Sequence, residues 1–165
     1  MAAKTQTELK DFGSIFSLEG KVVVVTGGSR GLGLHAASGQ AFFLALELYV
    51  GPTQLTISSS FLQAGCSKVY ITSRKASACA EACEALNALP TKRPGAKAIS
   101  VPADSAKVSD IEKLVAEVSK TTDHVDILFA NAGATWGEKF DTHPDSAFAK
   151  VMDLNVKSVF NTIRL

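Results

Sequence analysis

The chain has 165 residues, 46% of them hydrophobic and 20% charged, a composition typical of one soluble globular domain. Its 17 basic and 16 acidic residues leave a formal net charge of +1, which provides no field to attract nucleic acid or an anionic membrane. No secretion signal is visible, and the longest apolar run, 41–50, is far shorter than the ~20 residues that span a bilayer. We therefore expect a soluble cytoplasmic protein that binds neither nucleic acid nor membranes.

The cysteines and histidines indicate neither a disulfide framework nor a metal site. The three cysteines, Cys66, Cys79 and Cys83, are odd in number and include no Cys-x-x-Cys pair. Cys79 and Cys83 lie four positions apart on a predicted helix, where small buried or half-buried thiols are expected rather than metal ligands. The three histidines are scattered along the chain. A reducing compartment fits this pattern.

The chain begins with an expected loose extension, 1–17, and the predicted folded domain covers 18–165. Four consecutive valines at 22–25 have no polar alternation, which is typical of a strand buried on both faces of a parallel sheet. The strand continues into Thr26 and a turn rich in glycine.

Gly27, Gly31 and Gly33 make this turn suitable for a phosphate group. Side chains here would obstruct a tight turn and hold a pyrophosphate away from the backbone. The helix expected after Gly33 would offer free N–H groups and the positive end of its dipole. The alternative is a glycine-rich loop that binds nothing, but strand, glycines and helix start in this order favour nucleotide binding.

The first helix is interrupted by a segment of unusual composition. Residues 34–39 begin the helix, whereas 40–60 are first apolar, then contain Gly-Pro, and then are rich in Ser and Thr. Residues 61–65 resemble the end of an ordinary helix with Gly65 as its C-cap. We interpret 40–60 as an insertion into the first helix, either a retained intron that kept the reading frame or a genuine excursion of this protein.

A count supports this interpretation. The residue that contacts the ribose is expected about 20 positions after the glycine motif, at the end of the second strand. From Gly33 to Arg74 there are 41 positions, and removal of the 21 residues 40–60 leaves 41 − 21 = 20.

The rest of the chain alternates between strands and helices, which predicts a parallel, doubly wound α/β sheet. A helix start with Ser109 as N-cap precedes an apolar face made by Ile111, Leu114, Val115 and Val118. The expected elements are a strand at 68–72, a helix at 76–89, a strand at 97–101, a helix from Ser109, a buried strand at 125–130, and a helix from about Pro144 to the end of the chain.

Ser73 and Arg74 follow the second strand, where an acidic residue would accept hydrogen bonds from both ribose hydroxyls and repel a 2′-phosphate. A serine followed by an arginine would instead accommodate that phosphate. Arg30, within the glycine loop, would add a second positive charge. We therefore predict NADP(H) rather than NAD(H), the alternative being that both arginines are solvated surface charges.

The motif Thr-Gly-x3-Gly-x-Gly at 26–33 resembles that of the short-chain dehydrogenase/reductase family, and two later motifs strengthen the match. Asn131-Ala132-Gly133 at the end of the fourth strand is similar to the family's Asn-Ala-Gly triplet, which shapes the cofactor cleft. Leu154-Asn155-Val156 resembles the segment that carries its catalytic asparagine. The resemblance implies a Rossmann-like fold of about four strands in the order 3-2-1-4, with NADP(H) bound by Thr26, Gly27, Ser29, Arg30, Gly31, Leu32, Gly33, Ser73, Arg74, Asp104, Asn131, Ala132 and Gly133.

Two of these assignments have structural alternatives. In the family, an aspartate at the position of Asp104 contacts the adenine, but an acid there also suits the turn before a helix. The resemblance gives Asn155 the task of helping to hold a water in the proton relay. A mid-helix asparagine can equally be a surface residue that weakens its helix slightly.

The family's Ser and Tyr-x3-Lys motifs have no counterpart in this sequence. Tyr49 and Tyr70 are its two tyrosines, and neither is followed four residues later by lysine. The resemblance, strongest to reductases of the rhamnolipid 3-oxoacyl-[acyl-carrier-protein] type, therefore implies the N-terminal part of an NADP-dependent enzyme that reduces a small-molecule carbonyl to a hydroxyl. We expect this chain alone to be inactive.

The alternative class is a non-catalytic dinucleotide-binding module, or a gene fragment without function. In the order 3-2-1-4 the fourth strand lies at an open edge, which invites aggregation or a partner. The family forms homo-oligomers, and the resemblance leaves open whether this chain does.

Overall fold

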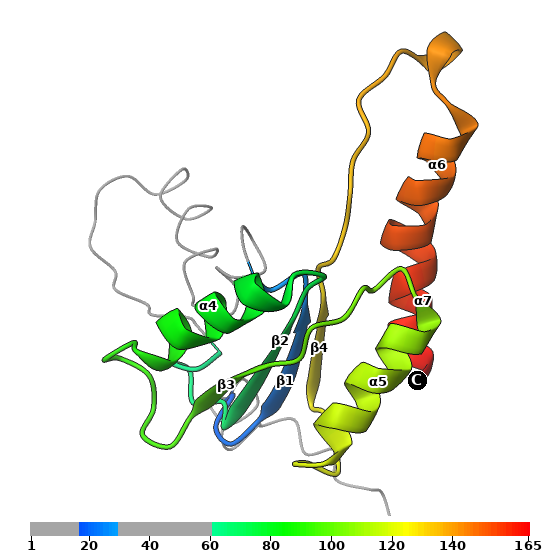
Figure 1. Cartoon of the computed structure of the whole chain (residues 1–165). Coiled ribbons are helices and arrows are strands. Elements are labelled where there is room, and N and C mark those ends of the chain that lie inside the picture. The colour runs from blue at the N-terminus through cyan, green and yellow to red at the C-terminus, as the bar shows by residue number, and fades with distance from the viewer. Residues whose placement is uncertain (1–16, 30–60) are drawn as a thin grey trace, which may run out of the picture.

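The computed structural model describes residues 17–29 and 61–165, and its centre is a parallel sheet of four strands (Figure 1). The strand order is β3-β2-β1-β4, with β1 and β2 in the middle. The predicted fold class and strand order are confirmed. The strands are β1 (Val22–Thr26), β2 (Lys68–Thr72), β3 (Lys97–Ser100) and β4 (Ile127–Ala130).

The valines of β1 supply the core on both faces of the sheet. Every residue of β1 is buried, as the unbroken valine run predicts. Val23 and Val25 pack with Leu86 of α4 (Ala76–Asn87). Val22 and Val24 point to the opposite face, because successive side chains of a strand alternate, and they pack with Leu114 of α5 (Val108–Ser119). Figure 1 shows α4 and α5 on opposite sides of the sheet.

Both covering helices follow their predicted patterns with small shifts at the ends. On α5, Ile111, Leu114 and Val118 are buried and Val115 is half-buried, as expected for a single apolar face. The prediction of Ser109 as N-cap is wrong: the helix begins at Val108 with Lys107 in that position and no side-chain cap. α4 ends at Asn87, two residues earlier than predicted.

Gly65 ends a turn just before β2 in the manner of a helix C-cap. Its φ of 105° is one that side chains disfavour, and the Cys66 N–H donates to the Phe61 carbonyl at 2.8 Å. This six-residue closure is the Schellman pattern found at helix ends. The predicted C-cap geometry is therefore present, while the rest of the predicted first helix and the proposed insertion 40–60 lie outside the described residues.

The C-terminal helix is continuous but changes its winding midway. α6 (Asp145–Met152) leads into the π-helical segment η2 (Asp153–Lys157), which continues as α7 (Ser158–Arg164). The wider turn is visible in the bond from the Ser158 N–H to the carbonyl of Asp153, five residues back. The short 3-10 turn η1 (Phe140–Thr142) precedes it, and Pro144 is the N-cap residue of α6.

The end of β4 next to this helix is exposed, contrary to prediction. The strand begins at Ile127, two residues later than expected. Ile127 and Leu128 are half-buried, whereas Phe129 and Ala130 are exposed. An apolar run cannot distinguish a central strand from an edge strand, and here β4 pairs with β1 alone among the described strands. The predicted open edge is confirmed, and the predicted burial is wrong.

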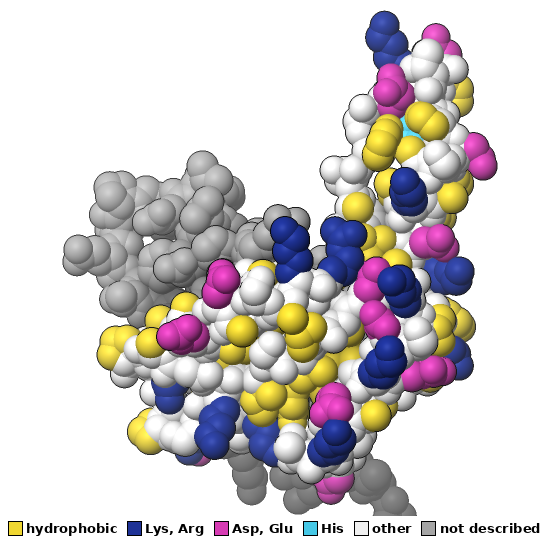
Figure 2. All heavy atoms as spheres, in the orientation of Figure 1, with side chains coloured by type: hydrophobic (Ala, Val, Ile, Leu, Met, Phe, Trp, Pro, Cys, Tyr) yellow, Lys and Arg dark blue, Asp and Glu magenta, His cyan; other side chains and the backbone are white. Residues whose placement is uncertain are grey.

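α6 projects beyond the sheet while α7 packs beside α5 and β4 (Figure 1). Hydrophobic side chains lie on the projecting part among charged ones (Figure 2). Within the described ranges, no helix is both long enough and apolar enough to cross a membrane.

Candidate functional site: a hollow at the carboxyl ends of the strands

The carboxyl ends of the four parallel strands surround a hollow of about 370 Å³. Ligands of open α/β sheets bind at this edge, where the loops leave the strands. Eight residues singled out from the sequence line it, and three further residues, Ala103, Ser105 and Leu154, were missed. The eight are Gly27, Ser29, Ser73, Arg74, Asp104, Asn131, Ala132 and Gly133.

The loop after β1 is tied to the loop after β4. The Asn131 carboxamide donates to the Thr26 and Gly27 carbonyls at 3.3 and 3.4 Å, and the Ala132 N–H donates to the Thr26 hydroxyl at 3.0 Å. Thr26 is 3% exposed, so it does not line the hollow but holds the loop beneath it through this hydrogen bond. These bonds hold Gly27 and Ala132 together as one wall of the hollow.

Glycine is required at position 27 by this close approach. Gly27 has a φ of 66°, and a Cβ there would lie 3.0 Å from the Cα of Ala132. The neighbouring Gly28 donates its N–H to the Thr72 carbonyl at 3.1 Å, which draws the loop over the end of β2. The remaining predicted cradle residues, Arg30, Gly31, Leu32 and Gly33, lie outside the described residues.

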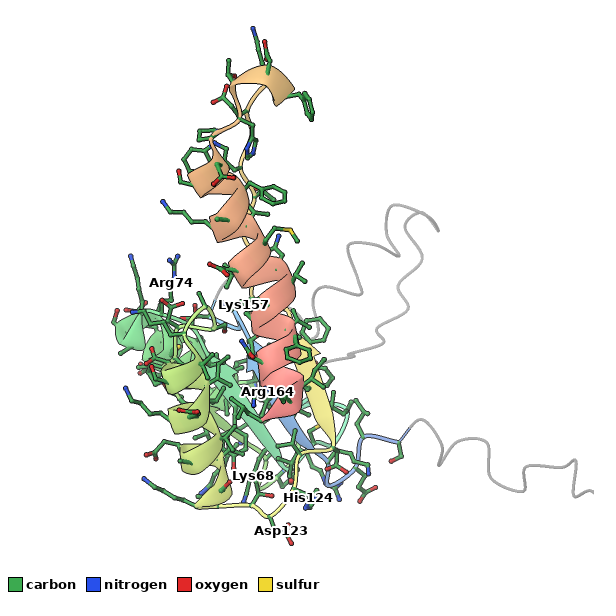
Figure 3. The ribbon with its side chains drawn as sticks, turned by 90° about the vertical axis from the view of Figure 1, so that its right-hand side faces the viewer. Lys68, Arg74, Asp123, His124, Lys157 and Arg164 are labelled. Carbon is green, nitrogen blue, oxygen red and sulfur yellow. The ribbon has the colours of Figure 1, made fainter. Side chains whose placement is uncertain are left out.

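Ser73 and Arg74 form the side of the hollow at the end of β2. Ser73 is half-buried and its carbonyl accepts the Ala103 N–H at 3.1 Å, which joins it to the loop after β3. Arg74 is exposed and stands at this end of the sheet, opposite the end that carries Asp123 and His124 (Figure 3). The hollow therefore has a cation and a hydroxyl at the position where a 2′-phosphate was predicted.

Asp104 lines the hollow and also stabilises the turn that leads into α5. One carboxylate oxygen accepts the Ala106 N–H at 3.1 Å, and the other lies 3.8 Å from the Lys107 ammonium. Its own N–H donates to Asp110 at 3.2 Å, and this bond, with Lys113 nearby, lowers the pKa of Asp110. Asp104 therefore stabilises the turn before the helix, as the structural alternative expects, and it also lines the hollow.

Asn155 lies in the π-helical segment and contacts the loop after β4. Its Oδ1 accepts the Ala134 N–H and its Nδ2 donates to the Ala134 carbonyl, both at 2.8 Å. A Cβ on Gly133 would approach Asn155 Oδ1 to 3.1 Å. The carboxamide thus holds the Gly133–Ala134 backbone, a contact that the sequence did not indicate.

A second, more open hollow of about 520 Å³ lies on the other side of the same loop, where the edge of β4 is free. Asn155 and Val159 line it together with residues 130–135. The Asn-Ala-Gly triplet therefore separates two hollows, and Asn155 borders the second one only.

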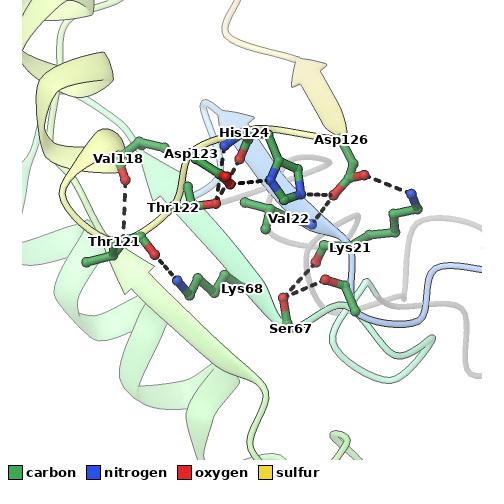
Figure 4. Close-up of polar contacts among 11 residues, drawn as sticks. Lys21, Val22, Ser67, Lys68, Val118, Thr121, Thr122, Asp123, His124 and Asp126 are labelled. Atoms are coloured by element: carbon green, nitrogen blue, oxygen red, sulfur yellow. Dashed lines mark hydrogen bonds and ion pairs between the residues drawn. The ribbon is translucent and has the colours of Figure 1, made fainter.

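A polar cluster stands at the opposite end of the sheet, before β1 and β4 (Figure 4). Asp126 accepts the Val22 N–H and pairs with the Lys21 ammonium, each at 2.8 Å, and both contacts lower its pKa. His124 lies 2.6 Å from Asp123 and 3.3 Å from Asp126, and the bond to Asp123 raises the pKa of His124. This cluster joins two strands and is remote from the hollow (Figure 3).

The three cysteines are free thiols buried on the α4 side of the sheet. Burial raises the pKa of Cys66 and of Cys83 to about 11, with Asp126 and Cys79 respectively adding to the shift. Cys66 and Cys83 therefore stay protonated at neutral pH and are not nucleophiles there. No group of three or more potential metal ligands occurs among the described residues.

Sheet order, covering helices and the hollow at the strand ends define a Rossmann-like, doubly wound nucleotide-binding fold. The family model of the short chain dehydrogenases matches residues 55–165. The chain belongs to the short-chain dehydrogenase family.

Individual relatives agree with this assignment. The rhamnolipids biosynthesis 3-oxoacyl-[acyl-carrier-protein] reductase of Pseudomonas aeruginosa is 34% identical over 90% of this chain and 47% of its own length. The 2-dehydro-3-deoxy-D-gluconate 5-dehydrogenase of Escherichia coli is 35% identical over 89% and 47%. The solved NADP active-site complex of RhlG from Pseudomonas aeruginosa superposes with a TM-score of 0.70, at 34% identity over 90% of this chain and 47% of that one. The chain thus spans about half the length of these relatives.

Proposed function

We propose that this chain binds NADP(H) in the hollow at the strand ends, as the cofactor-binding part of a short-chain reductase. The observation that carries the proposal is the convergence of Gly27, Ser73, Arg74 and Asn131 on one hollow from three different strand ends. The residues present fit the cofactor, because Gly27 leaves its backbone uncovered and no carboxylate follows β2 to repel a 2′-phosphate.

Each part of the hollow then has a task. The Gly27–Ser29 turn would approach the pyrophosphate with backbone N–H groups, and the sequence motif extends this expectation to Arg30, Gly31, Leu32 and Gly33, which lie outside the described residues. Ser73 and Arg74 bind the 2′-phosphate by a hydroxyl and a charge-assisted bond. Asp104 borders the adenine, and the Asn131–Gly133 loop bounds the cofactor on the β4 side.

The reaction we propose for the whole enzyme is reduction of a small-molecule carbonyl to a hydroxyl. When bound, the nicotinamide supplies the hydride. The names of the relatives, a 3-oxoacyl reductase among them, support a ketone substrate of that kind. In this chain the Asn155 carboxamide positions Ala134, and its second lone pair and second N–H would remain to hold a water, the task that the resemblance gives it.

Direct titration tests the cofactor assignment. Quenching of the single Trp136 and enhancement of reduced-nicotinamide fluorescence would be followed with NADPH and with NADH. We expect tighter binding of NADPH. Equal affinities would remove the role given to Arg74, and absence of binding of either would overturn the proposal.

A second candidate, a non-catalytic dinucleotide-binding module, is favoured by one observation. Tyr70 is buried, and its hydroxyl pairs with Thr121 on the α5 face, so it cannot donate a proton in either hollow. We therefore expect the 165-residue chain to bind NADPH without reducing ketones. NADPH-dependent ketone reduction by the purified chain would exclude the module and would require another proton donor.

A further inference from the structure

Behind Ser73, a buried cysteine contacts the side of the hollow proposed for the 2′-phosphate. Cys79 lies in the first turns of α4 and is fully buried. Its Sγ lies 3.1 Å from the Ser73 hydroxyl and 3.7 Å from the Ser73 carbonyl oxygen. The other partner of that hydroxyl is the Lys75 carbonyl, at a long 3.5 Å. Of these two partners of the Ser73 hydroxyl within the described part of the chain, the sulfur is the nearer.

The direction of this hydrogen bond matters for the ligand. A hydroxyl has one proton and two acceptor lone pairs, and a thiol is a weak donor and a weak acceptor. A phosphate ester needs donors, so the Ser73 proton must turn toward the hollow. One lone pair of the hydroxyl oxygen can then accept the Cys79 S–H from the protein side, which leaves the Ser73 proton free to point into the hollow.

We propose that Cys79 is a positioning residue for cofactor choice: its thiol donates to Ser73 and thereby orients the Ser73 hydroxyl as a donor to the 2′-phosphate of NADP(H). The inference rests on the proposed function and deepens it. A free ribose 2′-hydroxyl makes no such demand, because it can donate to Ser73 or accept from it. Loss of the thiol therefore weakens NADPH binding more than NADH binding.

Cys83 provides a matched control. It lies one turn further along the same helix, is 6% exposed, and packs into the apolar cluster between α4 and the sheet. Among the described residues, the thiol that hydrogen-bonds Ser73 is that of Cys79, and Cys83 does not line the hollow, so Cys83→Ala removes a buried thiol without touching it.

The experiment measures dissociation constants of the full chain for two ligand pairs, NADPH against NADH and adenosine 2′,5′-bisphosphate against adenosine 5′-monophosphate. Cys79→Ala should raise the constant for the 2′-phosphorylated ligands about threefold to tenfold, the size expected for one lost hydrogen-bond partner. The constants for the other two ligands should change less than about twofold, by the same reasoning. Cys79→Ser retains an O–H donor and should restore the preference, while Cys83→Ala should leave it unchanged.

A double-mutant cycle excludes a purely structural effect. In a Ser73→Ala background, Cys79→Ala should cause no further loss of NADPH preference, because the thiol acts through the hydroxyl. If Cys79→Ala does not fold, Cys79→Val refills the volume without a donor and should show the same loss.

The outcomes separate this inference from the proposed function. A wild-type chain that prefers NADPH, with Cys79→Ala or Cys79→Val retaining that preference, would overturn the role of Cys79 alone. Equal loss for all four ligands, or the same loss in Cys83→Ala, would show a structural role and also overturn it. A wild-type chain without preference would overturn the NADP(H) assignment itself.

Discussion

Asn155 connects the C-terminal helix to the loop that bounds the hollow, so its removal should affect both stability and binding. Asn155→Ala deletes two 2.8 Å hydrogen bonds to Ala134. Since hydrogen bonds contribute roughly 0.5–1.5 kcal/mol each and this pair is exposed, we expect a loss of about 1 kcal/mol in the free energy of unfolding. NADPH binding should weaken as well, because Gly133 beside it lines the hollow. Urea denaturation and fluorescence titration measure the two effects.

Lys157→Ala is the control for that substitution. Lys157 belongs to the same π-helical segment and its exposed side chain pairs with Asp153. Exposed ion pairs of this kind contribute little to stability, so the free energy of unfolding should change by no more than about 0.5 kcal/mol. An Asn155→Ala chain as stable as Lys157→Ala would show that the Ala134 contact is not maintained in solution.

Arg74 should determine most of the cofactor preference. Arg74→Ala removes the exposed cation at the end of β2, and a hydrogen bond to a charged group contributes about 1.5–3 kcal/mol. Because about 1.4 kcal/mol corresponds to a tenfold change in affinity, we expect NADPH affinity to fall about tenfold or more. NADH affinity should be nearly unchanged. Lys113→Ala, which removes an exposed cation of α5 that does not line the hollow, should alter neither affinity. Comparable losses for the two cofactors in Arg74→Ala would contradict a 2′-phosphate contact.

The sequence predicts much of the hollow because backbone requirements and charge are local properties. Gly27 and Ser73 are placed by their positions after strands, and the structure brings them together as expected. Leu154 and the Asn155–Ala134 contact could not be predicted, because they depend on the angle at which a later helix returns to the sheet. Asp104 shows that the sequence cannot separate a structural role from a binding role, since its carboxylate stabilises a turn and also lines the hollow.

At the scale of elements, periodicity predicts the existence of strands and helices better than their environment. β2 occupies its predicted bounds, and the face of α5 is correct. The π-helical segment 153–157 has no hydrophobic signature, because one wider turn barely disturbs an apolar period. The burial of β4 was overestimated because Phe129 and its neighbours are apolar whether or not another element covers them.

The polar cluster that joins β1 to β4 should make stability depend on pH. The pKa of His124 is raised in the folded state by its hydrogen bond to Asp123, with the charge of Asp126 adding to this. A raised pKa means that the protonated histidine stabilises the fold. That contribution is complete below the unfolded value of about 6.5 and is lost as the pH rises through the folded pKa. Urea midpoints measured from pH 5.5 to 8.5 should therefore fall with rising pH over that window.

Substitution separates this effect from other titrations. His124→Gln should abolish the fall, whereas His143→Gln, outside the cluster, should retain it. The contribution of Asp126 to stability has the opposite pH dependence, because its pKa is lowered by Lys21 and the Val22 N–H. This contribution is present above about pH 3.9 and disappears as the pH falls through the folded pKa. An unchanged urea midpoint in wild type across pH 5.5 to 8.5 would show that the His124 pairs do not form in solution.

The whole molecule has one well-covered part and one uncovered part. α4 and α5 close the two faces over β1 and β2, whereas α6 projects beyond the sheet (Figure 1) and carries apolar side chains in contact with solvent (Figure 2). At the free edge of β4, Phe129 is exposed as well. Phe148, Met152, Val156 and Phe160 are 57%, 40%, 54% and 63% exposed. A spacing of four residues keeps them on one side of the helix, so they form a row rather than isolated exposed residues.

This row, together with the edge of β4, should make the chain self-associate. Sedimentation equilibrium of the wild-type chain at increasing concentration should show a rising average mass, because apolar rows and open strand edges of this kind are covered by a partner when one is present. Phe148→Glu combined with Phe160→Glu should shift the chain toward the monomer, since each introduces a charge that would be buried at the contact. Phe140→Glu is the matched control: its ring is fully exposed on η1, outside the row, so the same change of type should leave the association intact. A wild-type chain that stays monomeric at all concentrations would mean that neither surface binds a second copy, and an equal effect of Phe140→Glu would attribute the association to general hydrophobicity instead of the row.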